Sequence, residues 1–262
     1  MVRVFYSFLK TSAIVFGLAM FFSSCIPQKE IILLQPENSK TNKSEFTHAP
    51  YEDYRFNYGD NAYINIKSLD EQSNEIFNPN SRNSNQATQN DAGIYLNSYT
   101  IDSNGEINFP LIGKIKLVGL TQHEAIDKIQ TAVDVYIKET TVVVKLVNFN
   151  VTILGEVKRP GEFKIYQDKL NILEAIALAG DMSEYGNKKA IKLMRLTNTG
   201  REMVLIDLTK ESVLESPYFF LKPNDIIYVA PMSAKQFGFA SFPYTLLFAT
   251  ISSVILILSY IK

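Results

Sequence analysis

The chain of 262 residues contains a single cysteine, Cys25, and this count constrains the fold more than any other feature. One cysteine can neither close an intramolecular disulfide nor supply a thiolate metal site of the usual paired kind. The folded part must therefore be held together by apolar packing. The composition allows this, because 46% of the residues are hydrophobic, and the length is enough for two small domains.

Cys25 directly follows an apolar segment near the start of the chain. Arg3 and Lys10 precede that segment, and residues 11–22 are almost wholly apolar. The run is shorter than the roughly 20 residues that a spanning helix needs, so it predicts a secretory signal over residues 1–24. The residues that end in Cys25 resemble the lipobox of bacterial lipoproteins, which implies that its thiol carries a diacylglycerol, with palmitate among the acyl chains. The alternative is a free cysteine inside an uncleaved signal anchor.

The segment after the cysteine and the net charge of the chain limit which partners the protein can have. Residues 25–54 are polar and contain three prolines, which is typical of a tether that leads from the membrane lipid to a first domain. The formal net charge of the chain is −1. A chain with no positive excess has little attraction for phosphate backbones, so we expect no nucleic-acid partner.

Residues 55–148 have the pattern of a first domain. Ala62, Ile64 and Ile66 alternate with polar positions, which predicts a strand. Residues 71–91 are rich in Asn, Gln and Ser and poor in residues that could form a core. We therefore expect a flexible insertion there.

Turn and cap signals continue through the rest of this domain. An Asn-Gly pair at 104–105 predicts a hairpin that pairs the β-prone runs on either side of it. Thr121 and Glu124 have the spacing of a capping box, and apolar residues follow at helical intervals, which predicts an amphipathic helix. Residues 142–147 are mainly apolar and predict a strand buried on both faces.

Residues 149–231 predict a second unit, a small mixed sheet wrapped on one helix, of the β-grasp kind. The Arg-Pro-Gly-Glu sequence at 159–162 suits a type II turn between two strands. Asn171 and Glu174 predict the start of a short helix, and Gly180 predicts its end in the left-handed conformation.

The last segment, residues 243–261, has no charged side chain and predicts a transmembrane helix. A buried core helix is the alternative. Thr245, Ser252 and Ser259 recur every seven residues along it. Small hydroxyl residues on one helical face predict a contact with another helix or a surface that faces a water-filled lumen.

The sequence offers little support for catalysis. Its two histidines, His48 and His123, lie in the tether and in the first turn of the capped helix. Neither zinc-protease, paired Cys/His nor EF-hand spacing occurs, and the phosphate-loop and nucleophile-elbow motifs are missing. We therefore expect no enzymatic activity, no metal and no cofactor other than the lipid on Cys25.

Three stretches of the chain carry a family resemblance. The first is Pro-Leu-Ile-Gly-Lys at 110–114 followed by Gly-Leu-Thr at 119–121, the second is Leu-Gly-Glu-Val at 154–157 followed by Arg-Pro-Gly, and the third spans residues 221–229. Together with the lipidated start they resemble the polysaccharide export lipoproteins of Gram-negative bacteria, in which an export domain precedes a soluble-ligand-binding β-grasp (SLBB) domain. The residues that we expect to shape this scaffold are Gly105, Pro110, Gly113, Gly155, Glu156, Pro160, Gly161, Gly180 and Asp225.

The resemblance implies an α+β fold in which a small mixed-sheet export domain over 55–148 is followed by an SLBB domain over 149–231. It also implies a ring of identical subunits in the outer membrane. Such a ring conducts capsular polysaccharide or exopolysaccharide passively from the periplasm, in contact with an inner-membrane chain-length regulator, or co-polymerase. The alternative is a non-conducting lipoprotein that binds glycan or a partner as an adaptor of the export machinery.

Overall fold

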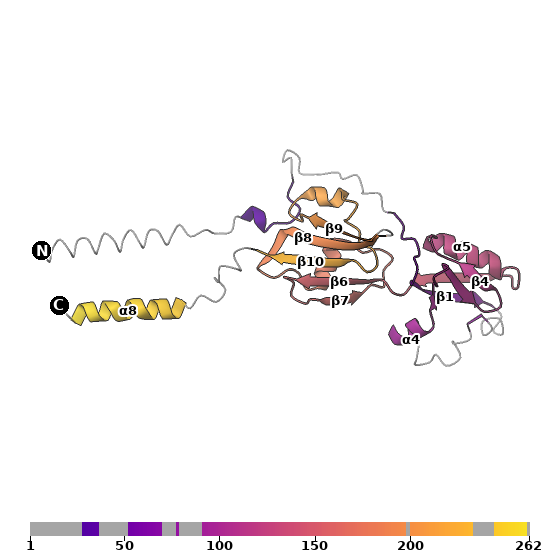
Figure 1. Cartoon of the computed structure of the whole chain (residues 1–262), viewed down its shortest axis with the longest axis horizontal. Helices are drawn as coiled ribbons and strands as arrows, with labels where there is room; N and C mark the ends of the chain where they lie inside the picture. Colours follow the sequence, from indigo (N-terminus) through magenta and orange to yellow (C-terminus); the bar gives the residue numbers. More distant parts are fainter. Residues whose placement is uncertain are drawn as a thin grey trace.

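The computed structural model describes residues 28–36, 52–69, 77–78, 91–197, 200–232 and 244–260. They form two domains that follow one another in the sequence and a C-terminal helix that lies apart from both (Figure 1). Each domain has its own cluster of buried apolar side chains. The predicted α+β class is confirmed. Cys25 lies outside the described residues, so its lipidation stays a prediction.

The first domain is built on a three-stranded sheet with the order β2-β1-β5. Its strands are β1 (Asn61–Ser68), β2 (Tyr99–Thr100) and β5 (Thr140–Leu146). Alternation in β1 buries Ala62, Ile64 and Ile66, as predicted. All strand pairs of this domain are antiparallel, so the prediction of a mixed sheet in it is wrong.

One helix covers this sheet. The helix α5 (Gln122–Val133) begins with the predicted capping box, in which the Thr121 hydroxyl accepts from the Glu124 N–H and the Glu124 carboxylate accepts from the Thr121 N–H. Its apolar stripe contacts β5, in which Val142 and Val144 are buried while Lys145 is exposed. The predicted burial of both faces of this strand is wrong because α5 covers only one of them.

A separate hairpin joins β3 (Glu106–Phe109) to β4 (Gly113–Lys116). Its turn lies at residues 110–112, and both Leu111 and Gly113 have positive φ. The Asn-Gly turn at 104–105 instead connects β2 to β3, which belong to different sheets. The predicted hairpin at this turn is therefore wrong. The Asp102 carboxylate accepts two backbone N–H groups there, and these bonds turn the chain out of the first sheet.

The described part of the predicted insertion at 71–91 includes an anchor for the core. Phe77 is only 1% exposed and stacks on Phe109 with ring centroids 6.4 Å apart. Asn78 donates to the Ile66 carbonyl at 2.7 Å and accepts from the Ile66 N–H at 3.2 Å, so it pairs with the backbone of β1. The helix α4 (Asp91–Leu96) returns the chain toward the same strand.

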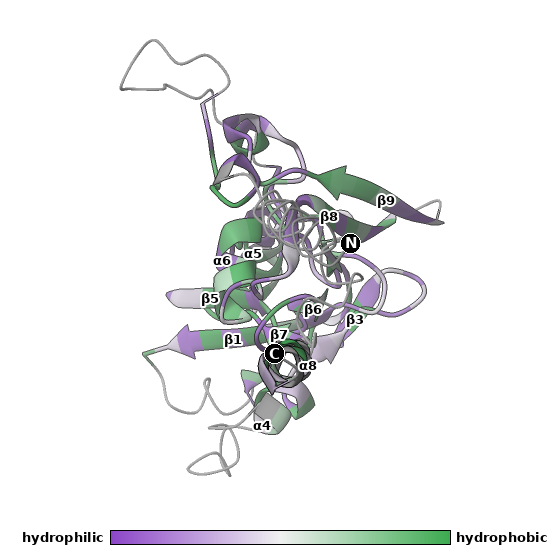
Figure 2. Ribbon diagram, turned by 90° about the vertical axis from the view of Figure 1, so that its left-hand side faces the viewer, coloured by the Kyte–Doolittle hydropathy of each residue, from purple (hydrophilic) through white to green (hydrophobic). Residues whose placement is uncertain are grey.

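The second domain is a five-stranded mixed sheet with the order β7-β6-β10-β8-β9. Its strands are β6 (Asn150–Gly155), β7 (Gly161–Lys164), β8 (Gly186–Thr197), β9 (Gly200–Ile206) and β10 (Ile226–Pro231). Only the β6–β10 pair is parallel. This mixed sheet, packed against one helix, agrees with the β-grasp prediction, and Figure 2 shows the hydrophobic character of that helix, α6.

The helix α6 (Ile172–Leu178) has the cap predicted from Asn171 and Glu174. Gly180 takes the predicted left-handed conformation with φ of 76°. The predicted type II turn at 159–162 is wrong, because Gly161 lacks the positive φ which that turn requires and begins β7 instead. The positive φ in this connection belongs to Gly155, at the end of β6.

Part of the predicted tether is docked on the second domain. The 3₁₀ helix η1 (Gln28–Glu30) precedes Leu34 and Gln35, whose N–H groups donate to the carbonyls of Leu208 and Thr209 at 3.0 and 2.7 Å. A second 3₁₀ helix, η3 (Glu211–Glu215), follows in the same region. This part of the tether is therefore fixed by backbone hydrogen bonds.

The C-terminal segment forms the helix α8 (Tyr244–Tyr260), whose rise is about 25 Å against a hydrocarbon core of about 30 Å. Among the described residues, none of the helices combines the length and the apolar character that a membrane span requires. The predicted transmembrane helix over 243–261 is therefore not supported. Thr245, Ser252 and Ser259 are exposed on α8.

Candidate functional site

The two domains meet at a short connection that is bonded to both. Val147 donates to the Asn61 carbonyl at 2.8 Å, and the Asn148 side chain accepts from the Asn61 N–H at 2.9 Å. On the other side, Asn224 donates to the carbonyl of Asn150 at 2.8 Å. The connection between β5 and β6 is therefore clamped to β1 in one domain and to the approach to β10 in the other.

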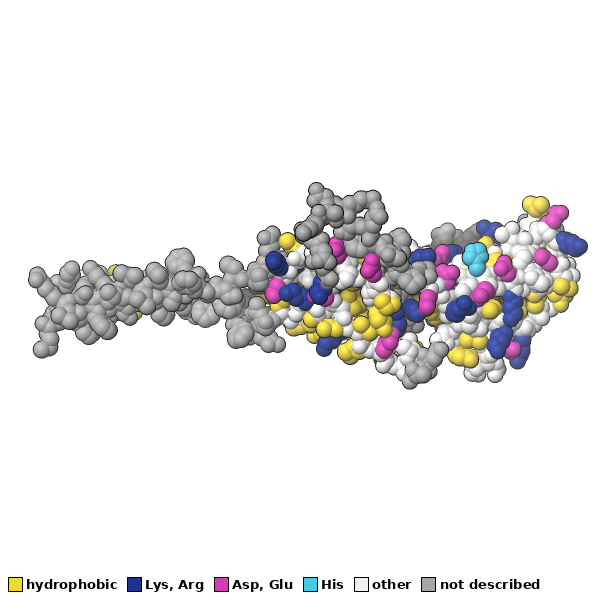
Figure 3. Space-filling view, turned by 90° about the horizontal axis from the view of Figure 1, so that it is seen from above, with side chains coloured by type: hydrophobic (Ala, Val, Ile, Leu, Met, Phe, Trp, Pro, Cys, Tyr) yellow, Lys and Arg dark blue, Asp and Glu magenta, His cyan; other side chains and the backbone are white. Residues whose placement is uncertain are grey.

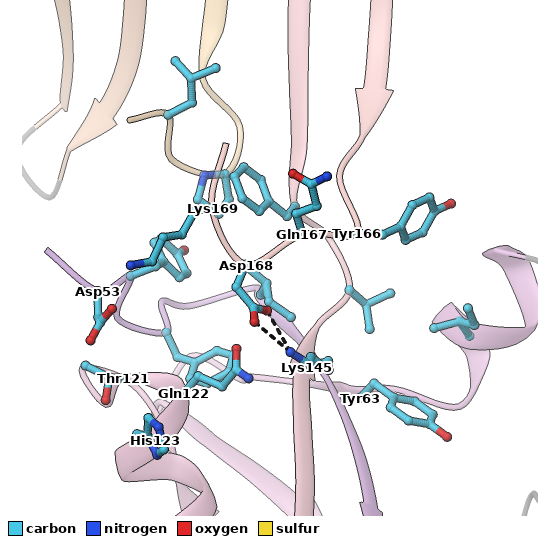
Figure 4. A pocket seen from close by; sticks show the side chains of 18 residues that line it. Asp53, Tyr63, Thr121, Gln122, His123, Lys145, Tyr166, Gln167, Asp168 and Lys169 are labelled. Atoms are coloured by element: carbon cyan, nitrogen blue, oxygen red, sulfur yellow. Dashed lines mark hydrogen bonds and ion pairs between the residues drawn. The ribbon is translucent and has the colours of Figure 1, made fainter. Parts of the chain in front are cut away.

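A cavity of about 640 Å³ opens beside this connection (Figure 4). Its lining comes from seven separate segments, and the residues with polar side chains are Asp53, Tyr54, Tyr63, Thr121, Gln122, His123, Lys145, Tyr166, Gln167, Asp168 and Lys169. The volume is in the range of small-molecule sites, and such sites often lie between domains. We call it the first junction cavity.

An ion pair crosses the first junction cavity from one domain to the other. Lys145 of β5 lies 2.9 Å from both carboxylate oxygens of Asp168, which follows β7 (Figure 4). In Figure 4, Tyr63 and Tyr166 lie on one side of this pair, and Asp53, Thr121 and His123 lie on the other. Both partners are half exposed, so the pair orients the walls more than it stabilises them.

Tyr54 is fixed at the edge of the cavity by a buried carboxylate. Its hydroxyl donates to Asp60 at 2.8 Å, and the Asn57 N–H donates to the same oxygen at 2.7 Å. Burial raises the pKa of Asp60, and the hydrogen bonds from Asn57 and Tyr54 oppose that rise. Burial, followed by the charge of Asp60, raises the pKa of Tyr54, so its phenol stays protonated and serves as the donor.

A second junction cavity of about 810 Å³ adjoins the first. The two share Asp53, Tyr54, Thr121 and Leu221. In the second, Arg195 is only 6% exposed and its guanidinium donates to both oxygens of Asp225, which is fully buried, at 2.7 to 3.2 Å.

Arg195 is held on two further sides. It donates to the Phe220 carbonyl at 2.9 Å, and it lies 5.4 Å from the centroid of the Tyr218 ring. Burial raises the pKa of Asp225, while hydrogen bonds from Arg195 and its charge act in the opposite direction. Arg195, held in place by these contacts, forms part of the wall of the second cavity.

The motif residues predicted from the sequence do not come together at the junction. None of Gly105, Pro110, Gly113, Gly155, Glu156, Pro160, Gly161, Gly180 and Asp225 lines either cavity. Glu156 accepts from the Ser183 hydroxyl at 2.7 Å, and Asp225 positions Arg195. Thr245, Ser252 and Ser259 lie apart, on α8. The motif residues inside the two domains therefore lie away from both cavities, and their role as scaffold stays a prediction.

Sequence reasoning did not find the junction cavities. His123 lies in the first turn of α5, as the sequence predicts, and is exposed there. Nothing in the sequence indicates that it also lines the first junction cavity. Within the described residues, no group of three or more His, Cys, Asp or Glu could hold a metal ion. On the face shown in Figure 3, acidic and basic side chains are interspersed over both domains.

An antiparallel α+β domain clamped to a β-grasp domain, with cavities at their junction, is an arrangement suited to a two-domain binding protein. Residues 48–147 match the family model for polysaccharide biosynthesis/export proteins, and residues 150–229 match the model for the SLBB domain. The chain therefore contains a polysaccharide biosynthesis/export domain followed by an SLBB domain. The family resemblance inferred from the motifs is confirmed, and the family has a transport role rather than an enzymatic one.

Two curated relatives each match about half of the chain. The EPS I polysaccharide export outer membrane protein EpsA of Ralstonia solanacearum is 30% identical over 138 residues, which cover 51% of this chain and 36% of the relative. The protein of the same name from Ralstonia nicotianae is 29% identical over 139 residues, with the same coverage. The match therefore spans just over a third of each relative's length.

Proposed function

We propose that this protein is a subunit of an outer-membrane channel that exports capsular polysaccharide or exopolysaccharide from the periplasm to the cell surface. The observation that carries the proposal is the pairing of an export domain with an SLBB domain, together with the export function in the names of both relatives. The proposed channel is a ring of identical subunits and conducts passively. Its soluble domains lie in the periplasm, anchored by lipid on Cys25.

The proposed partners follow from the same role. The polysaccharide is the substrate, and an inner-membrane chain-length regulator, or co-polymerase, delivers it to the ring. No catalytic step is required, because conduction through a lumen makes and breaks no covalent bond. The formal net charge of −1 supports a role without nucleic acid.

Deletion of the gene tests the export proposal. We expect surface polysaccharide to be lost and glycan to build up in the periplasm, with recovery when the intact gene is supplied in trans. Normal surface polysaccharide in the deletion strain would overturn the proposal. Metabolic labelling with palmitate, compared between the wild type and Cys25→Ala, tests the lipid anchor separately.

A second candidate function is a non-conducting adaptor that binds glycan at the domain junction. The two adjoining cavities favour it, because they lie within one subunit and need no ring to be complete. The oligomeric state in mild detergent separates the two functions. A closed ring supports the channel, whereas a monomer that binds glycan supports the adaptor.

A further inference from the structure

The junction cavities share a wall and differ in their lining. Asp53, Tyr54, Thr121 and Leu221 border both of them, so the cavities adjoin along the segment that enters the first domain. The first reaches toward β7 through Tyr166, and the second reaches β8 and β9 through Thr197 and Glu202. A ligand that fills both must be elongated and must contact both domains.

The first junction cavity combines aromatic rings with neutral polar groups. Tyr63 and Tyr166 contribute aromatic rings to the lining, and Tyr166 is 74% exposed. The amides of Gln122 and Gln167 and the hydroxyl of Thr121 can donate and accept. Aromatic rings next to groups that both donate and accept hydrogen bonds fit a ligand whose ring has apolar C–H faces and hydroxyl groups around its edge.

The two linings have no excess of positive charge. The first junction cavity has two acidic residues, Asp53 and Asp168, and two lysines, Lys145 and Lys169. The second has Glu52, Asp53 and Glu202 together with Arg55, Arg195 and Lys222, and two of these cations are already paired, Arg55 with Glu124 and Arg195 with Asp225. Neither cavity therefore concentrates anions. This lining favours an uncharged ligand over an anionic one.

We propose that the two junction cavities form one binding groove for an uncharged glycan segment that crosses the Asp53–Tyr54 segment. The proposal rests on the proposed export function, which supplies the class of ligand. Tyr166 contacts a sugar ring in the first cavity, and the Glu202 carboxylate accepts from a sugar hydroxyl in the second. The groove binds glycan within a single subunit, apart from any lumen that a ring would enclose.

Calorimetric titration of the full chain in detergent tests the groove. The probes are neutral oligosaccharides prepared by partial hydrolysis of the host's own surface polysaccharide and separated by length, with carboxyl-bearing fragments of matched length for comparison. We expect affinity to rise with length until both cavities are filled. Neutral fragments should bind more tightly than charged ones.

Two groove variants and a control locate the binding. Tyr166→Ala should weaken all neutral fragments by roughly tenfold. Glu202→Ala should weaken only the longer ones. Tyr136→Ala removes a tyrosine that is 56% exposed and lies outside both cavities, and it should leave affinity unchanged. Thermal unfolding of each variant shows whether it is folded.

The outcomes separate the groove from the export function. Affinity that does not change with length, tighter binding of charged fragments, or equal weakening by Tyr136→Ala would overturn the groove. If the wild type binds no fragment while the deletion strain still loses surface polysaccharide, the groove proposal is wrong and the export proposal is retained. If the deletion strain exports normally, the export function falls.

Discussion

At the scale of single residues, buried charge and backbone conformation determine which positions matter for stability. Arg195 and Asp225 form an ion pair that is almost fully buried, whereas Lys145 and Asp168 form one that is half exposed. Removing one partner of a buried pair leaves the other partner's charge uncompensated in the interior, which is costly. Removing one partner of an exposed pair leaves the other partner's charge solvated by water, which costs little.

Asp225→Ala is therefore expected to lower the free energy of unfolding by about 3–5 kcal/mol, because it leaves the Arg195 guanidinium buried without its carboxylate. Urea unfolding followed by circular dichroism measures the change. Asp168→Ala is the matched control and should cost less than about 1 kcal/mol. Similar losses for both variants would show that burial does not distinguish the two pairs.

Gly155 and Gly161 form a second matched pair. Gly155 has φ of 90°, and a Cβ there would meet the Val229 carbonyl oxygen, whereas a Cβ at Gly161 would meet nothing within 4 Å. We expect Gly155→Ala to lower the free energy of unfolding by about 1–3 kcal/mol. Gly161→Ala should change it by no more than about 0.5 kcal/mol. Chemical denaturation of both variants checks this difference.

The buried carboxyl of Asp60 gives stability a dependence on pH. Its folded pKa is raised above the unfolded value of 3.8 by burial, so its contribution is fully present below 3.8 and is lost as the pH rises through the folded pKa. The wild type should therefore gain stability relative to Asp60→Asn when the pH falls from about 7 to about 4. Parallel changes in the two proteins, in urea unfolding at both pH values, would contradict this assignment.

At the scale of elements, local signals predicted the helices better than the strand pairs. The caps at Thr121 and Asn171 and the end at Gly180 depend on neighbours within a few residues, and all three were predicted correctly. The Asn-Gly turn at 104–105 was found, but its strands pair elsewhere, because strand pairing depends on partners far along the chain.

The candidate site was beyond the reach of local patterns. Its walls come from the segment before β1, from β1 itself, from α4, from the start of α5, from the end of β5, from the segment after β7 and from the segment before β10. No spacing in the sequence brings these segments together, because only tertiary packing does so. Residues such as Gln122 and Lys169 therefore could not be singled out beforehand.

Thr245, Ser252 and Ser259 form a hydroxyl stripe on α8, and a substitution there tests whether this face makes a functional contact with another helix or with a lumen. Ser252→Leu should reduce export, because a bulky apolar side chain would replace a small hydroxyl on that face. The matched control is Val254→Leu, an exposed position of α8 outside the stripe, which should have little effect. A surface polysaccharide assay measures both, and equal export by the two strains would remove the stripe from the mechanism.

At the scale of the whole molecule, the junction makes the two domains one structural unit. The Asn148 side chain accepts from the N–H of Asn61, which is buried, and hydrogen-bonds to Asp60. The Lys145–Asp168 pair adds a contact across the first cavity. The bond between Asn148 and Asn61 is partly buried, whereas both partners of the ion pair are half exposed.

Asn148→Ala should therefore loosen the junction more than Asp168→Ala does. It leaves the Asn61 N–H without its acceptor, at a cost of about 1–3 kcal/mol. Amide hydrogen exchange at Asn61 and the rate of proteolysis between β5 and β6 should both increase. If Asp168→Ala accelerates them as much, the exposed ion pair rather than the clamp holds the domains together.

The clamped connection also has a mechanical meaning. Only three residues separate β5 from β6, and β5 pairs along nearly its whole length with β1, the middle strand of its sheet. A rotation of the second domain is therefore transmitted through β5 to the central strand of the first domain, because the connection is too short to absorb it. In the proposed ring, each subunit would therefore tilt as one rigid body, and a change in the angle between neighbouring subunits would move both domains together.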